Sequence, residues 1–127
     1  ELGDTILARN PNRAVDLVAI SGFACYLYCY TNITPTFRHL HSHSLIAPFT
    51  PEAWKQDLVN YIKHHSPEFI AVERNDEGAA QFAGASSTDS AIAAIPQMQQ
   101  LLQQNYDTLH AWPSVILYQS QANQPFK

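Results

Sequence analysis

The sequence predicts an α/β fold: a small Rossmann-like sheet with parallel central strands, flanking helices and a C-terminal strand pair. Two short apolar runs carry this prediction, residues 17–20 and residues 69–72, and neither alternates polar with apolar side chains. Strands of that composition are buried on both faces, as in a sheet that helices cover on each side. A helical pattern over residues 51–65 lies between the two runs, so we expect a strand–helix–strand unit whose strands are parallel.

The first part of the chain favours a helix on each side of the first strand. Apolar residues at helical spacing predict one helix over residues 1–9, and a tyrosine-rich run predicts another over residues 23–30. Two cysteines, Cys25 and Cys29, then lie one turn apart on the second helix. We interpret them as small buried hydrophobic side chains, with a strained disulfide as the alternative.

The helix over residues 51–65 has the best-defined start. Thr50 is a favourable N-cap, and Pro51 suits the first helical position. The spacing of the apolar residues predicts a single face toward the core, formed by Trp54, Leu58, Tyr61 and Ile62.

The last third of the chain begins with a long polar segment. Residues 75–89 are rich in Gly, Ala, Ser and Thr, and we expect a loop that is either functional or mobile. A helix follows with Pro96 in its first turn, and its outer face consists of solvated glutamines, namely Gln97, Gln100, Gln103 and Gln104. Residues 106–112 and 114–119 then predict a strand pair that turns at Pro113.

Length and composition favour one globular α/β domain over residues 1–127. The chain is 46% hydrophobic and 14% charged, which argues against disorder. Its longest uncharged stretch, residues 17–37, is broken by polar residues and proline, whereas a bilayer span needs about 20 mostly apolar residues. A net charge of −4 with scattered basic residues argues against nucleic acid as a partner.

No stretch of the chain matches a catalytic or cofactor motif. The G-x-S-x-G nucleophile elbow is missing, and so are the glycine-rich phosphate and dinucleotide loops. We therefore expect no catalytic residue and no cofactor in this chain, and the sequence leaves open whether the whole protein is an enzyme.

The best candidates for a site are the polar residues at the ends of the two parallel strands. Ligands of open α/β sheets gather at that edge. An arginine fork suits a carboxylate or phosphate, and a tyrosine ring stacks on a sugar. The alternative is an internal network in which the arginines pair with neighbouring carboxylates. The candidate ligand-binding residues are Ser21, Gly22, Tyr26, Arg38, Glu73, Arg74 and Asp76.

Three histidines alternate along a short stretch of the chain: His39, His41 and His43. In an extended segment all three point to one face, and imidazole is a common zinc ligand. No carboxylate or thiolate stands nearby to complete a tetrahedral site. A polar, partly exposed loop is the alternative to this candidate metal site.

Several short sequence segments, taken in order, resemble those of a known family. They are D-L-V-A-I-S-G, a tyrosine-rich segment that ends in Y-T-N, P-F-T-P-E-A-W, S-P-E-F-I-A-V-E-R-N-D and I-P-Q-M-Q-Q-L-L-Q-Q-N-Y. Over about residues 2–118 the chain resembles a soluble C-terminal domain of bacterial membrane glycosyltransferases of the dolichyl-phosphate-mannose–protein mannosyltransferase type. In that family the domain follows the transmembrane helices.

The resemblance implies a non-catalytic accessory domain on the extracytoplasmic (periplasmic) face of the inner membrane. It implies two partners, the transmembrane portion of the same polypeptide and a sugar or lipid-linked sugar. The chain begins at Glu1 inside a helical pattern, which fits a piece of a longer protein. Two alternatives stay open: a free-standing α/β domain that binds a small ligand or a protein at its strand ends, and a metal-binding protein that uses the histidines.

Overall fold

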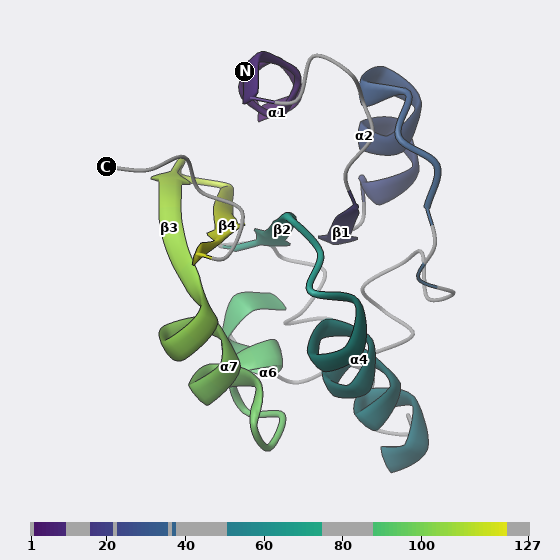
Figure 1. The fold of residues 1–127 in the computed structure, drawn as a ribbon, viewed down its shortest axis with the longest axis vertical. Coiled ribbons are helices and arrows are strands. Elements are labelled where there is room, and N and C mark those ends of the chain that lie inside the picture. The colour runs from purple at the N-terminus through teal and green to yellow at the C-terminus, as the bar shows by residue number, and fades with distance from the viewer. Residues whose placement is uncertain are drawn as a thin grey trace.

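The fold is taken from a computed structural model that describes residues 2–9, 16–21, 23–35, 37, 51–74 and 88–121. Four strands form one mixed sheet in the order β1-β2-β4-β3 (Figure 1). β1 (Leu17–Ile20) runs parallel to β2 (Phe69–Glu73), and β4 (Val115–Ser120) runs antiparallel to β2 and to β3 (Tyr106–Ala111).

Helices cover both faces of the sheet (Figure 1). α1 (Leu2–Arg9) and α2 (Ala24–Thr31) lie on one face. α4 (Glu52–His65), α6 (Thr88–Ala93) and α7 (Met98–Asn105) lie on the other. None of the helices in the described part of the chain has the length and apolar character that crossing a bilayer requires.

The unbroken apolar runs explain this layering. Alternate residues of a strand point to opposite faces, so each strand supplies side chains to two separate cores. The core under α1 and α2 contains Leu17, Ala19, Phe69, Ala71, Val115 and Leu117. The core under α4, α6 and α7 contains Val18, Ile20, Ile70 and Val72. Every residue of β1 is therefore buried, as the sequence predicted.

The structure confirms the mixed α/β class, the flanking helices, the parallel pair and the C-terminal strand pair. The expectation that the parallel strands are both central is wrong, because β1 forms an edge of the described sheet and the neighbour of β2 on its other side is the antiparallel β4. The reason is the connection of β4. It follows β3 by a short turn, which makes β3 and β4 antiparallel, and β4 then pairs with β2.

Local backbone geometry ends several of the helices. Asn32 after α2 and Ser66 after α4 adopt left-handed backbone angles, with φ of 56° and 44°. The Asn32 N–H donates to the Cys29 carbonyl, and the Ser66 N–H donates to the Ile62 carbonyl at 3.0 Å. These bonds satisfy carbonyls that a helix end leaves without an intrahelical partner.

α4 differs from its predicted form at its start. Pro51 occupies the N-cap position and the helix begins at Glu52; Thr50 lies outside the described residues. The prediction for Trp54 is wrong, because this side chain is 40% exposed. α4 begins away from the sheet and runs toward it, so its first turn lies beyond the core, and Leu58 and Ile62 carry the buried face (Figure 1).

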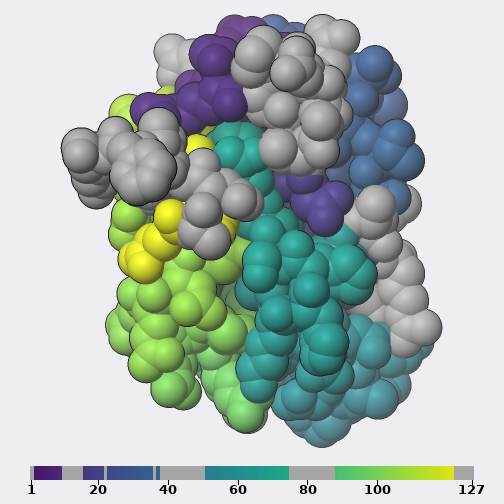
Figure 2. Space-filling view, viewed as in Figure 1, coloured from purple at the N-terminus to yellow at the C-terminus, as the bar shows by residue number. Residues whose placement is uncertain are grey.

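The segment before α7 also differs from prediction. α6 begins at Thr88, inside the range expected to be a loop, and residues 75–87 lie outside the described residues. Pro96 lies in the turn between α6 and α7 rather than in a helix. Gln97 there has a φ of 76°, and its side-chain carbonyl accepts a hydrogen bond from Lys63 Nζ of α4 at 3.0 Å. α4 and α7 form one continuous surface (Figure 2).

The cysteine prediction is wrong as well. Cys25 and Cys29 are both exposed and neither is in a disulfide. α2 turns its other side to the sheet, with Ala24, Leu27 and Tyr28 in the core. The thiols therefore face outward from the helix.

Candidate functional site

Two of the predicted strand-end residues have structural contacts near α2. Ser21 is fully buried, and its Oγ accepts a hydrogen bond from the Phe23 N–H at 3.2 Å, which shapes the turn into α2. Tyr26 is 70% exposed on α2, where its ring stacks on Tyr30 with centroids 6.2 Å apart. Ser21 is therefore part of a turn, and Tyr26 is part of the outer surface of a helix.

Arg74 connects the end of β2 to the β3–β4 turn. Its Nε donates to the Trp112 carbonyl at 2.8 Å, and its backbone N–H donates to the Ser114 carbonyl at 2.9 Å. Glu73 is half-buried and pairs in register with Val115. The guanidinium thus has a structural contact with a backbone carbonyl. Its pairing with Glu73 or Asp76 stays a prediction, and Asp76 lies outside the described residues.

The other predicted site residues lie outside the described residues: Gly22, Arg38, Asp76, His39, His41 and His43. Their binding roles stay predictions, as do those of Ser21, Tyr26, Glu73 and Arg74. Within the described ranges, no group of three or more His, Cys, Asp or Glu side chains is placed to hold a metal ion.

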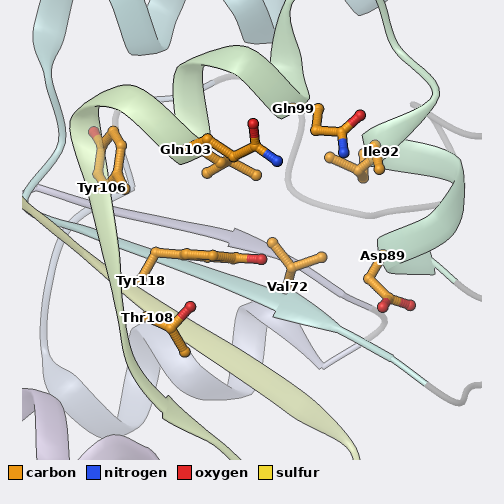
Figure 3. Close-up of a pocket in the computed structure, with 10 residues that line it drawn as sticks. Val72, Asp89, Ile92, Gln99, Gln103, Tyr106, Thr108 and Tyr118 are labelled. Atoms are coloured by element: carbon orange, nitrogen blue, oxygen red, sulfur yellow. The ribbon is translucent and has the colours of Figure 1, made fainter.

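A pocket of about 340 Å³ opens between α6, α7 and the sheet (Figure 3). In the close-up, side chains of the sheet form one wall, and side chains of α6 and α7 face them across the pocket. Its described lining residues are Val72, Asp89, Ile92, Ala93, Gln99, Leu102, Gln103, Tyr106, Thr108 and Tyr118. We refer to it as the α6–α7 pocket.

Local geometry explains why polar groups gather there. Gln99 and Gln103 are one helical turn apart on α7, so both amides lie on the same side of the helix. Thr108 and Tyr118 are register partners on β3 and β4, which places their side chains next to each other on one face of the sheet. Asp89 comes from the first turn of α6. Four separate elements, namely α6, α7, β3 and β4, thus supply hydrogen-bonding groups to one cavity.

The two tyrosines of the pocket differ in their hydrogen bonds. The Tyr106 hydroxyl is occupied, since it donates to the Pro67 carbonyl at 2.6 Å. The Tyr118 hydroxyl makes no hydrogen bond to any residue in the described ranges. Burial raises the pKa of Tyr118, and the negative charge of Asp89 raises it further against the opposing effect of Arg74. The Tyr118 phenol is therefore protonated at neutral pH and can donate to a ligand.

The chemistry of the lining favours an uncharged, hydroxyl-rich ligand. Val72, Ile92 and Leu102 supply apolar surface, while one carboxylate, two amides and two available hydroxyls supply donors and acceptors. No lysine or arginine is among the lining residues that the structure describes, so none of these side chains would pair with a phosphate or a carboxylate. A mostly apolar cavity with a few convergent polar groups is the usual form of a small-molecule site.

Comparison of this chain with protein-family models, with curated proteins and with solved structures finds no match. The site therefore has to be interpreted from its own geometry and chemistry.

Sequence reasoning missed most of the pocket. It assigned Asp89 to a loop, whereas this residue lies in the first turn of α6. The predicted solvated glutamines are exposed, and the sequence did not indicate that Gln103 also lines the cavity. The sequence did contain a signal for the wall of the pocket that β3 and β4 form. The predicted strand pair around Pro113 already implied that Tyr118 faces a residue of the preceding strand across a shared surface.

Proposed function

We propose that this chain is a non-catalytic accessory domain that binds a sugar in the α6–α7 pocket. The observation that carries the proposal is the described lining itself: one carboxylate, two amides and two hydroxyls converge over an apolar floor, and none of the described lining residues is basic. Sugars offer a ring of hydroxyls on an apolar frame, and such a ligand satisfies both parts of the lining.

The proposal places the domain in a membrane glycosyltransferase-like protein, on the extracytoplasmic (periplasmic) side of the inner membrane. Its partners are then the transmembrane portion of the same polypeptide and a sugar or lipid-linked sugar. The resemblance of the sequence motifs to that family supports this location and these partners. We also propose that the sheet is Rossmann-like. The parallel pair β1–β2, with α4 between the two strands along the chain, supports this relationship.

A binding role fits the pocket better than a catalytic one. Chemistry at a glycosidic bond typically uses a pair of carboxylates on either side of the bond. Among the lining residues that the structure describes, Asp89 is the only carboxylate. This part of the pocket therefore has groups that orient a sugar and supplies one carboxylate rather than a pair.

Thermal unfolding in the presence of neutral monosaccharides, sugar phosphates and nucleotides tests the proposal. A ligand that binds only the folded state adds roughly 2.7 kcal/mol to the free energy of unfolding at a hundredfold excess over its Kd. We expect a neutral sugar to stabilise the chain and the corresponding sugar phosphate to stabilise it less, because none of the described lining residues is a lysine or arginine that would pair with the phosphate.

Neighbouring glutamines on α7 provide a matched control. Gln103 and Gln104 are both exposed, and of the two only Gln103 lines the pocket. Gln103→Ala should reduce the sugar-induced stabilisation and Gln104→Ala should leave it unchanged; Tyr118→Phe should reduce it as well. Equal effects of the two glutamine substitutions, or stabilisation by no sugar, would contradict the proposal.

The alternative function is a free-standing α/β domain that uses the same pocket for another small ligand. The coding sequence upstream of Glu1 distinguishes the two proposed functions. Several apolar spans there would support the membrane glycosyltransferase-like parent. An immediate start codon would leave a sugar-binding domain without the membrane partner.

A further inference from the structure

Two free thiols share one hollow on the surface of α2. Cys25 and Cys29 are both exposed, and they are the only cysteines of the chain. Both line a hollow of about 330 Å³. The end of α2 and the residues that follow it supply the rest of its wall, namely Tyr28, Asn32, Ile33, Thr34 and Pro35.

The helix fixes the separation of the two thiols. α2 runs unbroken from Ala24 to Thr31. Its last turn is held by the Thr31 Oγ1, which donates to the Leu27 carbonyl at 2.8 Å, and by the Asn32 N–H, which donates to the Cys29 carbonyl. Residues four apart on such a helix have Cβ atoms about 5–6 Å apart.

That separation suits a bridging metal ion better than a disulfide. A disulfide needs Cβ atoms roughly 3.5–4.5 Å apart, so closing one across this turn would distort α2. A metal ion between two sulfurs adds length, since each metal–sulfur bond is about 2.3 Å. Two side chains that lean together from one helical turn can therefore hold an ion without moving the backbone.

The surroundings indicate which ion the pair would select. Soft thiolate ligands favour Cu(I), which is stable with only two of them in line. Zn²⁺ prefers four ligands, and no cluster of three or more His, Cys, Asp or Glu occurs in the described ranges. α2 itself carries no charged residue that would attract a hard cation. Ile33 and Pro35 give the hollow an apolar side.

We propose that Cys25 and Cys29 bind one Cu(I) ion between their Sγ atoms. Each thiol gives up its proton on binding, so two protons leave for each ion and the bound site carries one net negative charge. The site lies on the α1–α2 side of the sheet, opposite the α6–α7 pocket (Figure 1). It is therefore independent of the proposed sugar site.

Anaerobic titration of the full chain with Cu(I), in competition with a chromophoric Cu(I) chelator, tests the proposal. We expect one Cu(I) per chain and the release of two protons per ion in weakly buffered solution. Cys25→Ser and Cys29→Ser should each weaken binding by more than about a hundredfold, since each removes a direct ligand. Tyr26→Ser changes an exposed neighbour on the same helix that does not line the hollow, and it should leave binding unchanged.

Two further measurements identify the ligands. Mass spectrometry of the loaded protein should show a monomer, and one ion shared by two chains would overturn the proposal. A variant with His39, His41 and His43 all changed to Ala should keep its Cu(I). Loss of Cu(I) in that variant, together with retention in the two serine variants, would assign the ion to the histidines and overturn the cysteine site.

Discussion

The sheet face under α1 and α2 and the face under α6 and α7 both contain tyrosines, but they use the hydroxyls differently. Under α2, the Tyr28 hydroxyl donates to the Leu17 carbonyl and accepts from the Ala19 N–H, each at 3.1 Å. Under α7, the Tyr118 hydroxyl lies beside an open cavity. In Figure 3 it points across the sheet toward Val72.

The packing of the two faces explains this difference. Small residues, Ala19, Ala71 and Gly3, lie on the α1–α2 side and let the helices come close to the sheet and to each other. The opposite side carries Val72 and Ile70, and α6 and α7 leave a cavity above them. A tyrosine hydroxyl therefore stabilises the fold on one face of the sheet and is available for a ligand on the other.

The largest expected effect is that of Tyr28→Phe. Tyr28 is 6% exposed, and its hydroxyl satisfies two backbone groups of β1, an edge strand of the described sheet. Removing it leaves both groups buried without a partner, which should lower the free energy of unfolding by roughly 2–3 kcal/mol. Tyr118→Phe removes a hydroxyl with no such bond and should change stability by less than about 0.5 kcal/mol.

Urea denaturation of the two phenylalanine variants measures the difference. The sugar-binding assay completes the comparison, since Tyr118→Phe should impair binding and Tyr28→Phe, while folded, should not. Equal losses of stability would show that the two hydroxyls do not differ as the structure indicates.

A smaller effect concerns the contact between α1 and α2. A Cβ added at Gly3 would lie 2.3 Å from Tyr30 Cδ1, so the ring has to move and its hydrogen bond to Asp4 is lost. Gly3→Ala gains about 1 kcal/mol of helix propensity. We expect the displaced ring to outweigh that gain, with a net destabilisation of about 1 kcal/mol.

A double-mutant cycle tests this explanation. In a Tyr30→Ala background the clash is absent, so Gly3→Ala should become stabilising by up to about 1 kcal/mol. A substitution that destabilises equally in both backgrounds would show that Tyr30 is not the reason for the glycine.

Most helices and strands of the fold could be predicted from the sequence. Doubly buried runs predicted β1 and β2 and their parallel pairing, and helical spacing predicted α1, α2 and α4. These patterns are local in the sequence. A strand that is buried on both faces has to lie in a sheet that helices cover on each side, so few arrangements fit it. The edge position of β1 could not be predicted in this way, because it depends on where β4 inserts.

The orientation of α2 shows why local patterns are sometimes insufficient. Leu27 and Tyr28 face the core, while Cys25, Cys29 and Tyr26 face outward. Both sides of this helix are uncharged, so hydrophobicity alone does not indicate which one the sheet covers. The choice follows from the fit of the Tyr28 hydroxyl to β1, which is a tertiary contact.

The pocket was harder to predict because a β-bulge sets one of its walls. The register between β3 and β4 shifts between Thr108 and His110, which leaves Leu109 as an extra residue. A regular hairpin around residues 113–114 would pair Leu109 with Tyr118, whereas the bulge pairs Thr108 with it. Thr108 therefore contributes a hydroxyl to the pocket at the position where a regular register would place Leu109.

The smallest predicted effect is a pH dependence at the start of β2. Glu68 is 8% exposed, and its best contact is a long one, from Gln119 Nε2 to Glu68 Oε1 at 3.5 Å. Burial raises the pKa of Glu68, and the Gln119 amide only partly opposes this. The folded state therefore binds the Glu68 proton more tightly than the unfolded state does. The stability that Glu68 contributes is complete below the ordinary pKa of 4.5 and is lost as the pH rises through the folded-state pKa.

Glu68→Gln keeps the shape of the side chain and removes this titration. At neutral pH the variant should be more stable than the parent chain by up to about 1 kcal/mol, and the difference should disappear below the ordinary pKa of a glutamate. Urea denaturation at several pH values measures it. Glu52→Gln, at the exposed start of α4, makes the same change in net charge and serves as the control. A Glu68→Gln variant that is less stable at neutral pH would show that Gln119 fully compensates the buried charge.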